Sequence, residues 1–474
     1  MTIVRLEYAQ LLRSRAVVTG VLLLAAAGAF AIAHGRSVIA GQQHAIAASA
    51  ALQREQHQAI LGVVPPTAIA GDQAYYLRFF TAHEPSAWAP VSIGQRDVQP
   101  FNLKVRLLSI HGQLYDAELN NPLLSAFGNF DLAFVLVFLV PLVSIALTYN
   151  LWSSERELGT WDLVRSQPAS PLWVLGVKLA VRGSVVVVPA VALVIAAAVM
   201  LGLPWDWRLG AVLLGTVVYA LIWLAAAVLI GALGRSSDFN LVALLAVWVV
   251  WTILGPAFVT MAVSARYPIA ESLEIAVRQR QGYHASWDRR VQETMALFYE
   301  RHPQWRHVPV PDDRYSNAWY YGMQHRGDLE AEPAAAAWRE AIERRERWTA
   351  RLVVLFPPVL FQRALNATAA TDLASHLAYL DSVIAFHERL EAWYVPANFD
   401  NRTVAAMDWG AAPVHAHRAA PDAVTVTSAL GALAFVAVLL AAIGAFACAR
   451  QLTPRQRRRA VAVGTPAPQS RAQA

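Results

Sequence analysis

The sequence predicts an all-α integral membrane protein with six transmembrane helices and a mostly helical external domain formed by two long loops. The first observation is composition: 56% of the 474 residues are hydrophobic and only 15% are charged, whereas a soluble protein usually carries about 25% charged residues. The second is a set of six apolar runs, each near the roughly 20 residues that a helix needs to cross about 30 Å of hydrocarbon. These runs cover residues 16–33, 130–149, 181–201, 209–233, 241–263 and 424–449.

The charge balance points to lipid and not to nucleic acid. The formal net charge is +6, but Arg supplies nearly all of the positive charge, and much of it lies beside apolar runs. The only Lys residues are Lys104 and Lys178, and the only Cys is Cys448. A single Cys excludes an intramolecular disulfide, so a domain outside the membrane must be held together by packing. We expect the lipid bilayer as a partner and no nucleic acid.

Residues 1–15 are predicted to form a cytoplasmic amphipathic helix, because Val4, Tyr8, Leu11 and Leu12 share one helical face. The first span follows at 16–33. A basic start, an apolar stretch and Ala-Ile-Ala at 31–33 also fit a cleavable signal peptide, which remains the alternative. The amphipathic helix in front of the run favours an uncleaved anchor.

The distribution of Arg and Lys predicts the orientation, because cytoplasmic loops carry an excess of these residues. With six spans, both termini and the 150–180 segment are cytoplasmic, and 450–474 forms a basic cytoplasmic tail. The loops at 34–129 and 264–423 are then external. The residues counted on the cytoplasmic side are Arg5, Arg13, Arg15, Arg156, Arg165, Lys178, Arg235, Arg450, Arg455, Arg457, Arg458 and Arg459.

The two external loops contain predicted helices. In the first loop, 36–61 is helix-like and 85–98 is extended. In the second, we predict one long polar helix at 269–301, a Pro-rich connector at 303–315, a helix at 331–356 that ends at Pro357-Pro358, and a helix at 372–393. Glu and Arg side chains four residues apart support the helix at 331–356. Because both loops leave the same bundle, we expect them to fold against each other as one domain.

No motif for catalysis occurs. A P-loop ends in Gly-Lys-Ser or Gly-Lys-Thr, and neither Lys of this chain lies in one. No Gly-x-Ser-x-Gly or His-Glu-x-x-His motif is present either, so we expect no enzyme, and a membrane-bound hydrolase has no support. His415 and His417 could contribute to a metal site, since imidazole binds copper, nickel and zinc. No Cys or Met cluster accompanies them, and we assign no metal.

The spans carry almost no charge, which argues against an ion-coupled carrier. Asp131, at the outer end of the second span, is interpreted as a helix-start residue. Pro141, Pro189 and Pro256 are expected to kink their helices, which a bundle tolerates. Several polar and aromatic residues of the spans could line a translocation path, or could equally be ordinary interhelical packing. They are Thr216, Tyr219, Trp223, Trp248, Trp251 and Thr252.

The most informative segment is the charged stretch between the second and third spans, which reads Ser-Glu-Arg-Glu-Leu-Gly-Thr at 154–160. One charge at the bilayer centre costs roughly 2.5–3.5 kcal/mol, so this stretch must lie outside the hydrocarbon. A short charged segment held at the surface suits docking into a groove on another protein, where complementary charges fix the register. The alternative is a solvated loop that only connects two spans.

This stretch continues as Leu-Val-Arg-Ser-Gln-Pro-Ala-Ser at 163–170 and Leu-Gly-Val-Lys-Leu at 175–179. Together they resemble the permease subunits of type-two ABC exporters, with Val164 in place of a second Leu and Ala169 in place of Val. Residues 88–98, 114–122 and 365–372 resemble a subgroup with large periplasmic insertions, grouped with the permeases of copper-enzyme maturation. Ala370 stands where that subgroup usually has Gly.

The resemblance implies a permease subunit that pairs with a second permease subunit, as a homo- or heterodimer, and binds an ABC ATP-binding subunit. ATP and Mg would be bound by the partner ATPase, and no cofactor by this chain. ATP hydrolysis would be coupled to substrate export. The alternative is an ATPase-driven mechanotransmitter that acts through its external domain on a periplasmic or cell-envelope partner without transport. The implied coupling residues are Glu155, Arg156, Glu157, Gly159, Thr160 and Arg165.

Overall fold

The computed structural model describes the chain except for residues 1, 116–128, 167–169, 270–271, 310–315 and 453–474. It is 78% helical. Among the described residues, six helices are long and apolar enough to cross a membrane, which confirms the helical class and the number of apolar helices. Most of the 114–122 motif and of the 450–474 tail, and the end of the 303–315 connector, lie outside the described residues.

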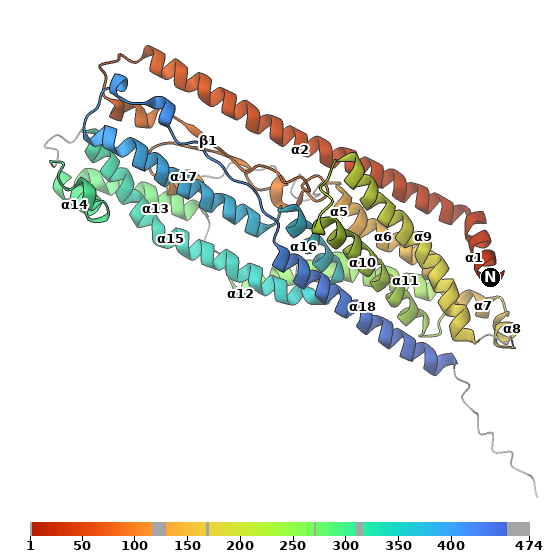
Figure 1. The fold of residues 1–474 in the computed structure, drawn as a ribbon. Helices are drawn as coiled ribbons and strands as arrows, with labels where there is room; N and C mark the ends of the chain where they lie inside the picture. Colours follow the sequence, from red (N-terminus) through yellow and green to blue (C-terminus); the bar gives the residue numbers. More distant parts are fainter. Residues whose placement is uncertain (1, 116–128, 167–169, 270–271, 310–315, 453–474) are drawn as a thin grey trace, which may run out of the picture.

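The molecule is elongated, with the six apolar helices packed at one end and the two long loops folded together at the other (Figure 1). We call these parts the apolar bundle and the loop domain. Helix α10 lies inside the bundle, in contact with α6, α9, α11, α16 and α18. The bundle consists of the first part of α2 (Arg15–Val63), α5 (Leu132–Phe134) with α6 (Val140–Thr148), α9 (Pro171–Met200), α10 (Trp207–Gly231), α11 (Ser237–Val249) with α12 (Gly255–Arg266), and α18 (Ala423–Leu452).

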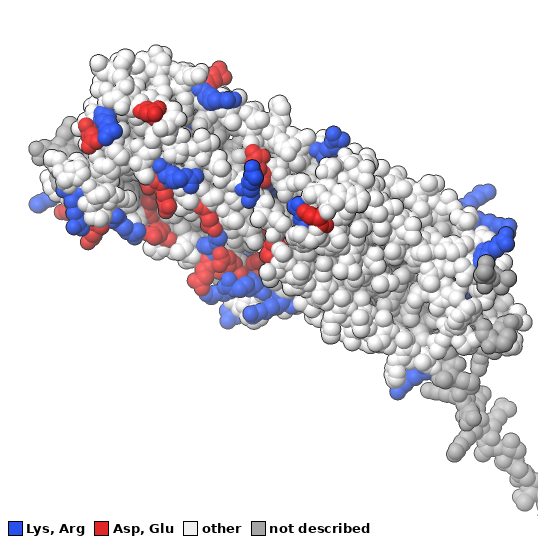
Figure 2. All heavy atoms as spheres, in the orientation of Figure 1, with Lys and Arg blue, Asp and Glu red and all other residues white. Residues whose placement is uncertain are grey.

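Charged side chains are distributed unevenly over the face drawn in Figure 2. They gather on the loop domain and around α1 (Thr2–Arg13) at the opposite end, and the surface between them is almost free of charge. The uncharged band covers the apolar bundle. Such a band is what a hydrocarbon layer requires, because charge at its centre is costly.

Helix α2 joins the bundle to the loop domain without interruption. Its 49 residues span about 70 Å at 1.5 Å per residue. The sequence predicts a span at 16–33 and a separate helical stretch at 36–61, and the structure makes them one helix. Gly35 lies between the two stretches and permits a close contact: a Cβ added there would lie 2.1 Å from the carbonyl oxygen of Pro90.

Two prolines of the bundle follow a wider turn of helix. The residues before Pro141 and Pro256 form π-helical segments, Val135–Leu139 and Val250–Leu254. A proline inside an α-helix lacks the N–H donor and its ring clashes with the carbonyl four residues earlier. The wider turn moves that carbonyl away. The expected disturbances at these prolines therefore take the form of π segments, whereas Pro189 lies within the continuous helix α9.

The first loop contains a small antiparallel pair of strands, β1 (Phe79–Ala82) and β2 (Asn102–Val105), with Phe79 opposite Val105. The prediction of an extended segment at 85–98 is wrong. That segment forms turns and a short 3₁₀ helix, Gly94–Asp97, and then leads to β2 and to α3 (His111–Leu114). Its Trp88 and Val91 are buried in the core of the apolar bundle. Burying both side chains there favours a compact conformation of the segment over an extended one.

The second loop is helical with boundaries that differ from those predicted. The single helix at 269–301 is wrong: α13 (Ser272–Ala285) and α14 (Val291–Arg301) are separated by a 3₁₀ turn whose Trp287 packs edge-on against Trp319 at 5.1 Å. Helix α15 (Asn317–Leu352) starts well before 331, because the Ser316 hydroxyl caps it, and it continues through Pro333. Helix α17 (Leu373–Phe399) starts after Asp372, as predicted, and passes 393.

Both loops contribute to one hydrophobic core. Leu77, Phe79 and Val105 of the first loop pack with residues of α17, among them Tyr379 and Phe386. The edge-to-face contact of Phe79 with Phe386 has a centroid distance of 6.5 Å. The expected association of the two loops is therefore seen in their packing.

Helix α16 (Pro357–Ala369) belongs to the second loop in sequence but packs against the bundle. Helix α15 and the short 3₁₀ turn after it end before Pro357-Pro358, as predicted, and Pro357 is the first residue of the new helix. Phe361 and Leu365 are buried in the bundle core. The close fit needs small residues opposite: a Cβ on Gly215 would lie 2.8 Å from the Phe361 ring, and one on Gly255 would lie 2.0 Å from Phe356.

The turn after α16 is left-handed. Ala370 has φ 54° and ψ 48° and is buried, although a left-handed conformation favours glycine. Ala370 thus keeps the turn at the position where the resembling subgroup usually has Gly.

Candidate functional site

The charged segment forms two short helices at the end of the bundle near α1. Helix α7 (Ser153–Glu157) and helix α8 (Trp161–Ser166) are joined by a turn at Gly159, whose φ of +72° suits glycine. Figure 1 places α1, α7 and α8 at the same end of the molecule, remote from the loop domain. We call this region the α7–α8 end.

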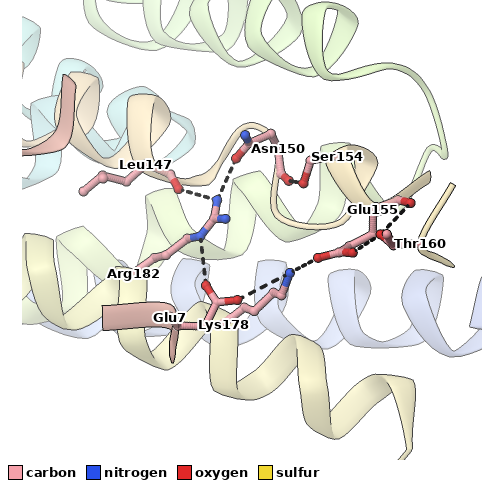
Figure 3. Close-up of polar contacts among 8 residues, drawn as sticks. All are labelled: Glu7, Leu147, Asn150, Ser154, Glu155, Thr160, Lys178 and Arg182. Atoms are coloured by element: carbon pink, nitrogen blue, oxygen red, sulfur yellow. Dashed lines mark hydrogen bonds and ion pairs between the residues drawn. The ribbon is translucent and has the colours of Figure 1, made fainter. Parts of the chain in front are cut away.

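Glu155 is bound by side chains of the same chain. Its Oε1 lies 2.5 Å from the Lys178 Nζ, and the Thr160 hydroxyl donates to its other carboxylate oxygen (Figure 3). Lys178 Nζ is also 3.5 Å from a carboxylate oxygen of Glu7. Glu155 therefore joins α7 to α9, and through Lys178 to α1.

Arg182 extends this arrangement. Its Nη1 donates to the Leu147 carbonyl at 2.9 Å and to the Asn150 Oδ1 at 2.6 Å, and its Nε is 4.0 Å from Glu7. Glu7, Lys178 and Arg182 are each less than 10% exposed. Two carboxylates and two cations thus balance one another, which a buried ion cluster requires. We call these four residues, Glu7, Glu155, Lys178 and Arg182, the charged cluster.

Helix α1 buries a face that differs from the apolar face its sequence pattern predicted. Glu7 and Leu11 are buried, whereas Leu12, assigned to the apolar face, is 74% exposed. The Tyr8 hydroxyl lies 2.6 Å from the Ser184 hydroxyl of α9. The charge of Lys178 and Arg182 explains why α1 buries a glutamate against α9.

Glu157 caps another helix. Its carboxylate accepts from the Ser237 N–H at 2.6 Å and from the Ser237 hydroxyl at 2.8 Å, at the start of α11. A carboxylate at a helix N-terminus is favourable because the free N–H groups carry partial positive charge. Ser153 reinforces the contact, with its hydroxyl 2.8 Å from that of Ser237. Glu157 thus fixes α7 against α11.

The remaining predicted coupling residues lie in the same segment. Arg156 lies over the Trp161 ring at 5.4 Å, which joins α7 to α8 across the turn. Thr160 contacts Glu155, as described above, and Arg165 lies in α8. The six residues lie in α7, in α8 and in the turn between them, and both glutamates bind partners within the chain.

The surface of this segment is apolar at two positions. Leu158 is 76% exposed and Leu163 is 65% exposed, and Gly159 and Asp162 between them are also exposed. The charge pattern did not predict these exposed leucines. The signal in the sequence was an apolar residue on each side of the Gly-Thr turn, next to charged residues.

The residues considered for a translocation path lie inside the bundle. The hydroxyls of Thr216, Thr252 and Tyr219 donate to backbone carbonyls of Val212, Trp248 and Val137. The Trp223 ring packs edge-on against Trp251 at 5.3 Å, and the Tyr219 ring lies 4.9 Å from Phe361 of α16. Trp248 packs against the same core. In this conformation Trp223 thus contacts both Tyr219 and Trp251, and the two threonines bond to the backbone of their own helices.

His415, one of the two histidines considered for a metal site, is hydrogen-bonded within the chain. Both ring nitrogens of His415 have partners, the Ala82 N–H at 3.2 Å and the Ser382 hydroxyl at 3.1 Å. Within the described residues, no group of three or more His, Cys, Asp or Glu side chains is arranged to hold a metal ion.

The fold and the α7–α8 end define a helical protein with six helices apolar enough to cross a membrane. Residues 273–418, most of the second loop, match the model of a family described as a domain of unknown function, DUF3526. No curated protein and no solved structure matches the chain.

Proposed function

We propose that this chain is the permease subunit of an ABC transporter and couples ATP hydrolysis by a separate ATPase subunit to substrate export. The observation that carries the proposal is the α7–α8 end: a short surface element fixed by buried charges on α1 and α9 and by the cap on α11. Such an element would transmit displacement to α1 and to the bundle helices α9 and α11. The resemblance of 154–179 to type-two exporter permeases identifies the partner class.

The exposed leucines are the proposed contact with the ATPase. Leu158 and Leu163 are large, apolar and exposed at an end that also carries Arg5, Arg13 and Arg15. In the proposed orientation this end is cytoplasmic. The sequence contains no P-loop, so ATP and Mg would be bound by the partner, and a second permease subunit would complete the transporter in the inner membrane.

A mechanotransmitter is a second candidate, and two observations favour it. Helix α2 runs unbroken from the bundle into the loop domain, and α16, which belongs to the second loop, packs its Phe361 against Tyr219 of the bundle. Motion at the α7–α8 end would reach the loop domain through these helices without opening a path. The loop domain would then act on a periplasmic or cell-envelope partner.

The test is co-purification from the native membrane. The full chain, tagged at its C-terminus, is captured in mild detergent, and co-purified ATPase is quantified by mass spectrometry and by ATP hydrolysis. We expect an ATP-binding subunit in the wild-type sample. The double variant Leu158→Asp, Leu163→Asp should lose most of it, because two buried contacts of about 1–2 kcal/mol each would be replaced by charge.

The matched control is Val414→Asp, which places the same charge at an 80% exposed apolar site of the loop domain. It should leave co-purification unchanged. An ATPase that remains bound to the double variant at the wild-type level would rule out the proposed contact. Absence of any ATPase from the wild-type sample would contradict the permease proposal itself.

A further inference from the structure

A small cavity in the loop domain is lined by polar side chains from two distant parts of the chain. The first loop contributes His83, Gln95 and Arg96, and the second contributes Thr371 and His376. Gln99, Phe101 and Asp372 complete the lining. The cavity has about 10 Å³ of space for a water-sized sphere, which is room for a single atom of that size.

Arg96 is a buried cation without an ion-pair partner. It is 4% exposed, its Nε donates to the Gln42 Oε1 at 3.0 Å, and its Nη2 donates to the His83 carbonyl at 2.7 Å. Its Nη1 has no hydrogen-bond partner, and no carboxylate of the described residues lies within 4.0 Å of the guanidinium. Burial lowers the pKa of Arg96 to about 10, so it stays charged at neutral pH.

A charge removed from water without a counter-charge is costly. Glu84 attracts Arg96 from a greater distance, but Glu84 is exposed and its field is screened by solvent. Asp372 lines the cavity, yet its Oδ1 accepts from the Ser375 N–H and hydroxyl at the start of α17. Among the described residues, Arg96 therefore has no ion-pair partner.

Three further polar atoms of the cavity residues are buried with no hydrogen-bond partner in the described part of the chain: His83 Nε2, His376 Nδ1 and Gln95 Oε1. Burial lowers the pKa of His83 to about 3 and of His376 to about 4, and the charge of Arg96 adds to both shifts, so both rings are neutral. A neutral imidazole still has one N–H, which either nitrogen can carry. The amide of Gln95 also offers an N–H when it is turned over.

We propose that this cavity binds one halide ion, chloride under cellular conditions, held by the Arg96 Nη1 and by N–H groups of His83 and His376. A metal cation is disfavoured because the permanent charge of Arg96 would repel it. The single-atom space excludes phosphate and larger oxyanions. The ion neutralises Arg96 and connects the first loop to the start of α17, and so stabilises the joint between the two loops.

The experiment uses the full-length protein in detergent, with thermal unfolding followed by Trp fluorescence. Chloride replaces gluconate at constant ionic strength. We expect the unfolding temperature to rise with chloride along a saturating curve by about 2–4 °C, because only the folded state binds the ion. Bromide should act in the same way.

Arg96→Met should abolish the dependence on chloride, and His376→Leu, which keeps Arg96 and carries no donor, should weaken chloride affinity about tenfold through loss of one hydrogen bond to an ion. The control Arg402→Met removes an exposed ion pair with Asp400 and should leave the chloride dependence as in the wild type. Should Arg96→Met fail to fold, broadening of the chlorine-35 resonance by the wild-type protein, reversed by bromide, provides the direct measurement.

A water molecule in the cavity would give no saturable halide effect and would overturn the proposal. So would a halide effect of equal size in Arg96→Met, which would place the ion elsewhere. Stabilisation by phosphate that also requires Arg96 would show a larger anion site and would contradict the single-atom ligand.

Discussion

At the scale of residues, each charge of the charged cluster at the α7–α8 end lies beside a charge of opposite sign. The Lys178 Nζ lies 3.5 Å from a carboxylate oxygen of Glu7 and 2.5 Å from one of Glu155. Arg182 donates to the Leu147 carbonyl of α6 and to the Asn150 side chain in the turn that precedes α7. Removing one member leaves an unpaired charge with little access to water, which costs far more than an exposed ion pair contributes. The positions of these charges were visible in the sequence. Their pairing was not, because it depends on how α1, α7 and α9 pack.

Lys178→Met should lower the free energy of unfolding by about 3 kcal/mol, because Glu7 and Glu155 would face each other without their shared cation. Adding Glu155→Gln should restore part of the loss. Chemical unfolding of the full chain in detergent measures both. The control Arg278→Met removes an exposed pair with Glu274 and should cost less than 1 kcal/mol. Equal costs for Lys178→Met and Arg278→Met would contradict a buried cluster.

The left-handed Ala370 gives a second residue-scale prediction. A Cβ in this conformation costs about 1 kcal/mol, which glycine avoids. Ala370→Gly should therefore raise the unfolding free energy by up to about 1 kcal/mol. Asn401→Gly is the matched comparison: Asn401 also has a positive φ, of 50°, but Asn tolerates it better than Ala. A stabilisation at Asn401 that exceeds the one at Ala370 would contradict the strain assigned to Ala370.

At the scale of elements, the prolines of the bundle show how packing completes a helix. Pro141 has no N–H for the carbonyl of Val137, and the Tyr219 hydroxyl of α10 donates to that carbonyl at 2.7 Å. A disturbance at Pro141 follows from the sequence alone. The identity of the donor does not, because it depends on which helix lies opposite. Tyr219, considered as a path residue, thus has a structural partner.

Tyr219→Phe should cost about 1–3 kcal/mol, since the buried Val137 carbonyl loses its hydroxyl donor and Pro141 has no N–H to replace it. In a Pro141→Ala background the N–H of residue 141 can replace the hydroxyl, so Tyr219→Phe should cost clearly less there. A double-mutant cycle of unfolding free energies measures the coupling between the two sites. Additive costs would show that the hydroxyl and the proline are independent.

At the scale of the whole molecule, the sequence predicted the six apolar helices and the α7–α8 segment because hydropathy and charge are local properties. It did not predict that α2 is continuous, that α16 packs into the bundle, or that Leu158 and Leu163 form the exposed face of the segment. Each of these depends on contacts between segments far apart in the chain. The exposure of Leu158 and Leu163 in particular depends on how α7 and α8 pack against α9 and α11, which only the folded chain reveals.

The continuity of α2 leads to a prediction about transmission that rests on the proposed ATPase partner. Gly41 lies in the middle of α2, exposed, with nothing within 4 Å of an added Cβ. Gly41→Pro should interrupt the helix there, because proline lacks the N–H donor and clashes with the preceding turn, at a cost of about 3 kcal/mol. Gly41→Ala, the matched control, favours the helix by up to about 1 kcal/mol.

In the complex with its ATPase, ATP should change hydrogen exchange in α15 and α17 of the wild type and of Gly41→Ala. The α7–α8 end lies far from residue 41 along α2 and α1, so Gly41→Pro should retain the ATPase and its hydrolysis but lose the ATP-dependent change in the loop domain. Retention of that change in Gly41→Pro would mean that α2 is not required for transmission. Helix α16 also joins loop-domain sequence to the bundle core, and α12 contacts α15, so that result would leave these two connections as the routes of transmission.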